Sequence, residues 1–243
     1  MKALGLATLT LFLFAAGPLL AQEMTLSLGD SSTVSARSVQ LILLLTVLSL
    51  APGVAVMVTC FPFVVTVLSI LRQAIGLQQA PPNMLIVSLA LFLTWYVMDP
   101  VFTEAWVNGL GPLSRDEIDI GAAITQTIAP FRQFMAARLD ADTFNTLAQL
   151  RPGPLPDRLP DAPLSLLIPS FMLSEIKLAF EIGFLVFLPF LIIDLVVAAV
   201  LMSMGMMMVP PAIVSLPFKL AFFVVADGWS LIASALVRSY MQP

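Results

Sequence analysis

The stretch IKLAFEIGFLVFLPFLIIDLVVAAVLMSMGMMMV, from Ile176 to Val209, decides the class of this protein. As a helix, its 34 residues would be about 50 Å long at ~1.5 Å per residue. The hydrocarbon core of a bilayer is only about 30 Å thick. The stretch also contains Glu181, Pro189 and Asp194, which a lone helix in lipid would not tolerate. We therefore expect it to be broken or to be packed inside a protein assembly.

The composition of the whole chain points to the bilayer as well. Of the 243 residues, 59% are hydrophobic and 11% are charged, whereas a soluble domain has about 25% charged residues. The net charge of −4 gives little support for nucleic-acid binding. Histidine is absent, and the single cysteine, Cys60, reads as a small buried residue. We therefore expect no metal centre, no cofactor and no Ser-His-Asp or Cys-His catalytic site, which argues against an enzyme.

The N-terminus has the pattern of a secretory signal peptide over residues 1–21. Lys2 precedes an apolar run from Ala3 to Gly17, and cleavage is expected after Ala21. An uncleaved N-terminal anchor is the alternative. Residues 22–38 form a polar leader. Cleavage of a signal would place this leader outside the cytoplasm.

Four apolar stretches predict an all-α membrane protein. They run from Val39 to Val58, from Met84 to Val101, from Ile176 to Val209 and from Ala212 to Val237. They define two hydrophobic hairpins, 39–102 and 174–243, around a polar insert, 103–173, with a helical middle from Ile118 to Leu150. With the N-terminus outside, the insert would be periplasmic. The prolines Pro189, Pro210, Pro211 and Pro217 are expected to interrupt the last two stretches.

Charged residues in the last two stretches need partners, because a bare charge at bilayer depth is costly. They are Glu175, Lys177, Glu181, Asp194, Lys219 and Asp227. Lys177 and Glu181 are four residues apart and can pair along one helix face. Asp194, Lys219 and Asp227 have no partner within a helical turn. Three interpretations are open: a proton relay, catalysis by paired aspartates, and ion pairing in a buried assembly. The absence of histidine argues against a relay, and no motif around the deep aspartates indicates catalysis, so pairing is favoured. Lys177, Glu181, Asp194 and Asp227 are then expected to be buried polar or packing residues, and Asp194 and Asp227 are assigned only packing or hydrogen-bonding roles.

Five methionines fall between Met202 and Met208 in LMSMGMMMVPP. A methionine cluster can simply fill a core, or it can form an adaptable apolar surface, because its side chain is unbranched and polarisable. We expect Met202 and Met204 to be helix packing. Gly205 before the run and Pro210-Pro211 after it predict a bend that presents Met206, Met207 and Met208.

Several ordered motifs resemble the FliP family of flagellar biosynthetic proteins, which also includes the virulence type III export-gate subunit. They are LRQAIGLQQAPPN (71–83), SEIKLAFEIGF (174–184), PFLIIDLV (189–196), GMMMVPP (205–211), PFKL (217–220) and DGW (227–229). The signal peptide favours the flagellar branch.

The resemblance implies a subunit of a protein export gate in the bacterial inner membrane, within the flagellar basal body. Five copies would assemble with FliQ and FliR into a helical pore that passes unfolded flagellar proteins outward, and FlhB and FlhA would complete the apparatus. By the same resemblance, Met206, Met207 and Met208 would form a gasket, and Glu175 and Lys219 would pair between subunits.

The alternative function is a proton-coupled small-solute transporter that uses Glu181, Asp194 and Lys219. Such transporters usually contain internal repeats, and none is evident in this sequence.

Overall fold

The computed structural model describes residues 31–77, 81–150, 158–206 and 208–241. All regular secondary structure in these ranges is helical, which confirms the all-α prediction. Among the described residues, three helices are long and apolar enough to cross a membrane, or four if one bent pair is counted as a span, close to the four expected. The predicted signal peptide and Met207 lie outside the described residues. The chain divides into two compact units, residues 1–50 and residues 51–243, which are described separately.

The first unit contains, among the described residues, the N-terminal part of helix α2 (Ser31–Met57). The stretch Ser38–Met57 is long and apolar enough to span a membrane, and none of its most apolar window is buried by the rest of the chain. Lipid or another protein must cover it.

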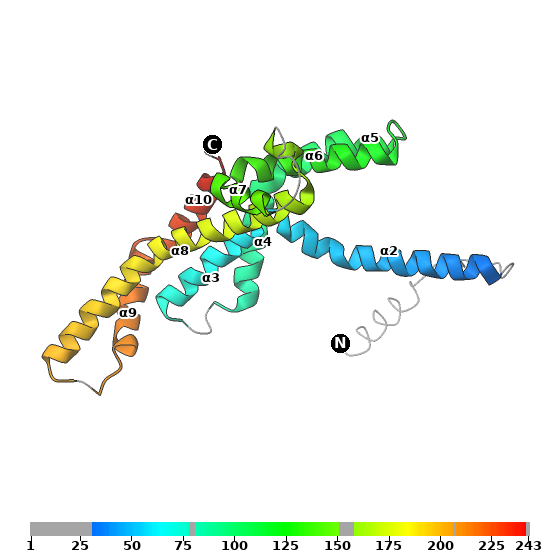
Figure 1. The fold of residues 1–243 in the computed structure, drawn as a ribbon. Helices are drawn as coiled ribbons and strands as arrows, with labels where there is room; N and C mark the ends of the chain where they lie inside the picture. The colour runs from blue at the N-terminus through cyan, green and yellow to red at the C-terminus, as the bar shows by residue number, and fades with distance from the viewer. Residues whose placement is uncertain (1–30, 78–80, 151–157, 207, 242–243) are drawn as a thin grey trace, which may run out of the picture. The chain divides into compact units, whose positions relative to one another are not determined.

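The core of the second unit is built on helix α3 (Phe61–Ile75), which packs along α8 (Leu164–Ser203) (Figure 1). Apolar residues three and four apart, such as Phe63, Val67 and Leu71, form its fully buried face. With 15 residues, α3 is too short to span a bilayer. A search for apolar runs of about 20 residues therefore did not identify α3 as a separate helix within the first hydrophobic hairpin.

Cys60 immediately precedes α3 and is completely buried. Burial raises the pKa of its thiol to about 12, so the side chain is a neutral apolar group at ordinary pH.

Helix α8 is continuous over 40 residues, about 60 Å, so Pro189 does not interrupt it, and the stretch is unbroken until the helix ends at Ser203. Pro169 and Pro189 lie inside it. A proline removes only one helical hydrogen bond, and in a 40-residue apolar helix the neighbouring turns keep the helix formed. Close packing fixes α3 against α8 at Gly183, where an added Cβ would lie 2.4 Å from the Ile70 Cδ1 atom.

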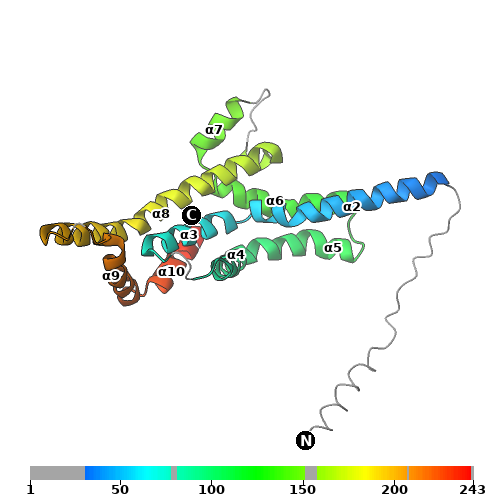
Figure 2. The same cartoon turned by 90° about the horizontal axis from the view of Figure 1, so that it is seen from below.

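The last apolar stretch is a bent pair of helices, α9 (Pro211–Val225) and α10 (Gly228–Met241), whose axes differ by 61°. Pro217, expected to interrupt this stretch, lies inside α9, and the break occurs at Asp227, whose φ is 47°. A side chain at Gly228 would collide with the Phe223 ring, 2.1 Å away, so glycine is required for the close approach. After the bend, α10 returns alongside α4 (Asn83–Ala105) (Figure 2).

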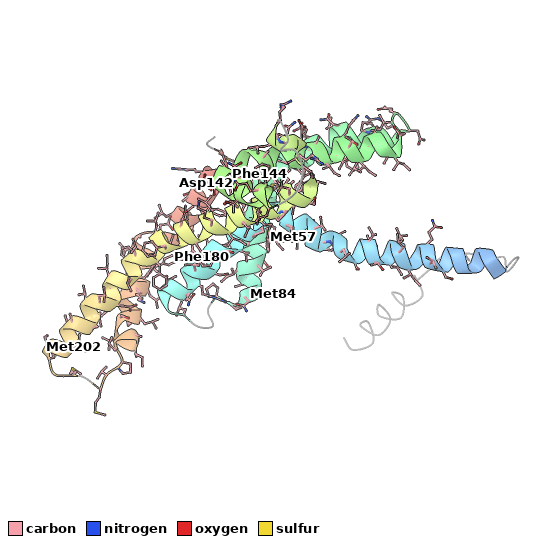
Figure 3. All side chains as sticks on the ribbon, in the orientation of Figure 1. Met57, Met84, Asp142, Phe144, Phe180 and Met202 are labelled. Atoms are coloured by element: carbon pink, nitrogen blue, oxygen red, sulfur yellow. The ribbon has the colours of Figure 1, made fainter. Side chains whose placement is uncertain are left out.

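The described residues of the insert are mostly helical. A π-helix (Trp106–Leu110) and α5 (Gly111–Ser114) continue from α4, followed by α6 (Ile120–Arg138), α7 (Ala141–Gln149) and a short 3-10 helix (Leu159–Asp161). Asp119 and Asp140 cap α6 and α7, and the chain turns between these helices at Leu139. Phe144 of α7 is buried against the N-terminal part of α8, whereas Asp142 is exposed (Figure 3).

Candidate functional site

The methionine loop, residues 204–210, connects the C-terminal end of α8 to α9 (Figure 3). Helix α8 ends because Gly205 adopts a left-handed conformation, with φ 74°. The Gly205 N–H donates to the Met202 carbonyl at 3.0 Å and the Met206 N–H to the Leu201 carbonyl at 2.9 Å, which is the Schellman pattern. Pro210 and Pro211 then occupy the N-cap and first position of α9, where a missing N–H costs nothing.

The described methionines at this end of α8 are exposed to different degrees. Met206 is 42% exposed and Met208 is 97% exposed. Met202 and Met204, which we expected to pack within the helix, are also exposed. The loop therefore presents unbranched apolar side chains that the chain itself does not bury.

An apolar groove of about 540 Å³ lies beside the loop, between the end of α8 and α9. Its walls include Val200, Leu201, Met204, Met206 and Phe218. Both the methionine loop and the groove between α8 and α9 therefore present apolar side chains.

Asp194, Ser215 and Lys219 form a polar cluster that connects α8, α9 and α3, which we call the Asp194 cluster. The Lys219 ammonium lies 2.6 Å from the Asp194 Oδ2 atom and donates to the Ala74 carbonyl at 3.2 Å. The Ser215 hydroxyl donates to Asp194 Oδ1 at 2.5 Å. The Lys219 side chain is 7% exposed and that of Asp194 32% exposed. Because Ala74 is in the last turn of α3, the cation also lies at the negative end of that helix.

Glu175, Arg138 and Tyr240 form a second cluster, the Glu175 cluster, at the other end of α8. Glu175 is 1% exposed, and its two carboxylate oxygens accept hydrogen bonds from the Arg138 Nε, at 3.2 Å, and from the Tyr240 hydroxyl. Arg138 also donates to the Ser239 carbonyl at 2.8 Å. Burial of this carboxylate is thus compensated by one cation and one hydroxyl.

The remaining predicted polar residues lie apart from these two clusters. Lys177 pairs at 3.1 Å with Asp140 rather than with Glu181. Lys177, Glu181 and Asp227 are exposed in the single chain, so their burial in an assembly stays a prediction. Hydrogen bonds from Thr143, followed by the Lys177 ammonium, hold the pKa of Asp140 below its ordinary value.

Glu175 and Lys219, expected to pair between subunits, each have other partners within the chain. A contact between two copies stays a prediction. Sequence reasoning missed Arg138, Tyr240 and Ser215. The spacing of Ser215 and Lys219, four residues apart on one helix, was the one local signal available.

In the described part of the chain, no group of three acidic, cysteine or histidine side chains could hold a metal ion. Each of the two polar clusters combines one acid with one base and one hydroxyl, an arrangement that stabilises helix packing.

Comparisons with known proteins point to one family. The FliP family model matches residues 44–236. The chain is 47% identical to the flagellar biosynthetic protein FliP of Caulobacter vibrioides, over 98% of this chain and 89% of the relative. It is 45% identical to the Bacillus subtilis FliP protein, over 88% and 96%, and 42% identical to that of Aquifex aeolicus, over 96% and 98%.

Proposed function

Because the chain belongs to the FliP family of flagellar biosynthetic proteins, we propose that it is a pore-forming subunit of the flagellar protein export gate. In this proposal it passes unfolded flagellar proteins across the bacterial inner membrane. The predicted signal peptide is removed, and the insert faces the periplasm.

The exposed methionine loop is the observation that carries this proposal. At the end of a helical hairpin, Met208 is almost fully exposed and Met206 is partly exposed. A pore that retains ions but admits varied unfolded chains needs a lining that is apolar and adaptable. Methionine provides both properties, and an apolar constriction can exclude water and ions by dewetting.

The length and exposure of α8 support an assembly. Its exposed apolar side chains extend from Leu173 to Met202, about 45 Å along the helix axis. A hydrocarbon core of about 30 Å can cover only part of that length, so other protein must cover the rest. We propose that this cover comes from a pentamer of the chain with FliQ and FliR, and that FlhB and FlhA bind the completed gate.

The intersubunit pair of Glu175 and Lys219 remains part of the proposal. Because both side chains have partners within the chain, their pairing requires Glu175 to leave Arg138 and Lys219 to leave Asp194. Assembly would then exchange two internal ion pairs for one between copies.

The test is the combined replacement of Met206, Met207 and Met208 by alanine. We expect an ion leak through a complex that still assembles, as shown by native mass spectrometry after mild extraction. Met84→Ala is the matched control, because Met84 is 81% exposed but belongs to α4. An unchanged leak in the triple variant would contradict the role as a seal.

Native mass also separates the export gate from the transporter. The gate predicts several copies of the chain with two other small membrane proteins. A monomer or dimer that binds a small solute would overturn the proposal.

A further inference from the structure

The Glu175 cluster joins three segments that are far apart in the sequence. Arg138 is the last residue of the insert helix α6, Glu175 lies in α8, and Tyr240 lies in the last turn of α10. Arg138 and Ser239 are separated by 101 positions. The cluster therefore ties the insert to the C-terminal helix across α8.

Each oxygen of the buried Glu175 carboxylate depends on a different helix. One oxygen accepts from Arg138 and the other from Tyr240. A buried charge that loses one hydrogen-bonding partner is destabilised strongly, because no water replaces that partner. Both helices must therefore be in place at the same time to satisfy Glu175.

Arg138 also contacts α10 directly. Its Nη1 donates to the Ser239 carbonyl, one of the last four carbonyls of α10, which have no partner within the helix. The positive charge lies at the negative end of that helix. The guanidinium carbon is 4.1 Å from the centre of the Tyr240 ring, a cation–π contact. Arg138 thus contacts both a backbone carbonyl and an aromatic side chain in the last turn of α10.

The Tyr240 ring completes the connection by apolar packing. It stacks on Phe134 of α6, with ring centres 6.0 Å apart and an interplanar angle of 15°. It also meets Phe63 of α3 edge to face at 5.5 Å. One side chain of α10 therefore contacts α6, α3 and α8.

We propose that the last turn of α10 fixes the insert against α8, with Arg138 and Tyr240 as positioning residues for Glu175. This role goes beyond pore formation and does not depend on it. The insert helix α6 and the C-terminal helix stabilise each other, so loosening either one loosens the other.

Hydrogen exchange on the unassembled full chain tests this reciprocity, because the proposed pairing between copies would withdraw Glu175 from Arg138. In Arg138→Met, we expect the amides of residues 239–241 to exchange at least about tenfold faster. In Tyr240→Ala, we expect the same for the amides at the end of α6. Arg238→Met is the matched control, because Arg238 is an exposed arginine on the same turn of α10. It should leave exchange in α6 unchanged.

Two milder variants keep the test decisive if the others fold poorly. Tyr240→Phe keeps the ring and removes only the hydroxyl bond to Glu175, so it should speed exchange in α6 less than Tyr240→Ala. Arg138→Lys keeps the charge but loses the fork that reaches both Glu175 and Ser239, so it should rescue Arg138→Met only in part. The proposal is overturned if each variant changes exchange only in its own helix.

Discussion

The Asp194 cluster allows a prediction whose direction follows from unequal burial. The Lys219 side chain is 7% exposed and the Asp194 side chain is 32% exposed. Asp194→Asn removes the negative charge that neutralises this buried ammonium and leaves it with neutral acceptors such as the Ala74 carbonyl. Removing one member of a buried ion pair costs about 3–5 kcal/mol, so this variant should be strongly destabilised.

Lys219→Met should cost less, although it breaks the same ion pair. Methionine fills the buried space of the lysine stem, and the Asp194 carboxylate that remains is one-third exposed and keeps its bond from Ser215. We expect a loss of about 1–2 kcal/mol. The double variant Asp194→Asn/Lys219→Met should recover most of the loss, because no buried charge is left without a partner.

Thermal unfolding of the purified chain in one detergent measures the difference. For a chain of this size, about 1 kcal/mol corresponds to a shift of roughly 2–4 °C in the midpoint. Asp194→Asn should therefore lower the midpoint by about 6–20 °C and Lys219→Met by about 2–8 °C. Lys177→Met is the matched control, because Lys177 is 53% exposed in its ion pair with Asp140 and should change the midpoint little.

Two results would refute this reasoning. One is a larger loss in Lys219→Met than in Asp194→Asn. The other is a double variant that is as unstable as the sum of the two single variants, which would mean that the side chains act independently.

Three further predictions concern single positions. Gly205→Ala should lower the unfolding free energy by about 1–2 kcal/mol, because a left-handed residue acquires a Cβ; Gly205→Asn should cost less, and equal costs would argue against a backbone origin. Gly183→Ala should lower the unfolding free energy by about 1–3 kcal/mol, because the added Cβ clashes with Ile70. Ile70→Val removes the clashing Cδ1 atom, so Gly183→Ala should lower the unfolding free energy less in an Ile70→Val background. Losses in the double variant that simply add would contradict this. Asp140 has a folded-state pKa below its ordinary 3.8, chiefly through its hydrogen bonds from Thr143, so its ionised carboxylate stabilises the fold above that pH and this stabilisation is lost as the pH falls through the folded-state pKa. The difference in unfolding midpoint between the natural chain and Asp140→Asn should therefore be larger at about pH 7 than at about pH 2. A difference that does not change with pH would refute this assignment.

Local sequence signals predicted the helical segments well where length or capping residues decide the structure. The apolar stretches around Val39 and Met84 are helices, because runs of that length need no distant contact to be recognised. Gly205 ends α8 and Pro211 begins α9, since both residues act through their own backbone geometry.

The same local signals failed at Pro189 and at the bend of the last apolar stretch. Pro189 was expected to break its helix and does not, because the long apolar helix around it outweighs one missing hydrogen bond. The bend occurs at Asp227 instead, where Gly228 allows the Phe223 ring to approach the backbone. No pattern within a few residues reveals that approach.

The sequence by itself determined that this is a helical membrane protein of the FliP family, with an apolar methionine run between a glycine and two prolines. Composition, run length and backbone preferences are local properties, and a linear sequence carries them completely. Only the tertiary structure decided that Asp194 meets Lys219, that Glu175 meets Arg138 and Tyr240, and that α3 is the core. These contacts join residues 25 to 65 positions apart, so they exist only after packing has brought their helices together.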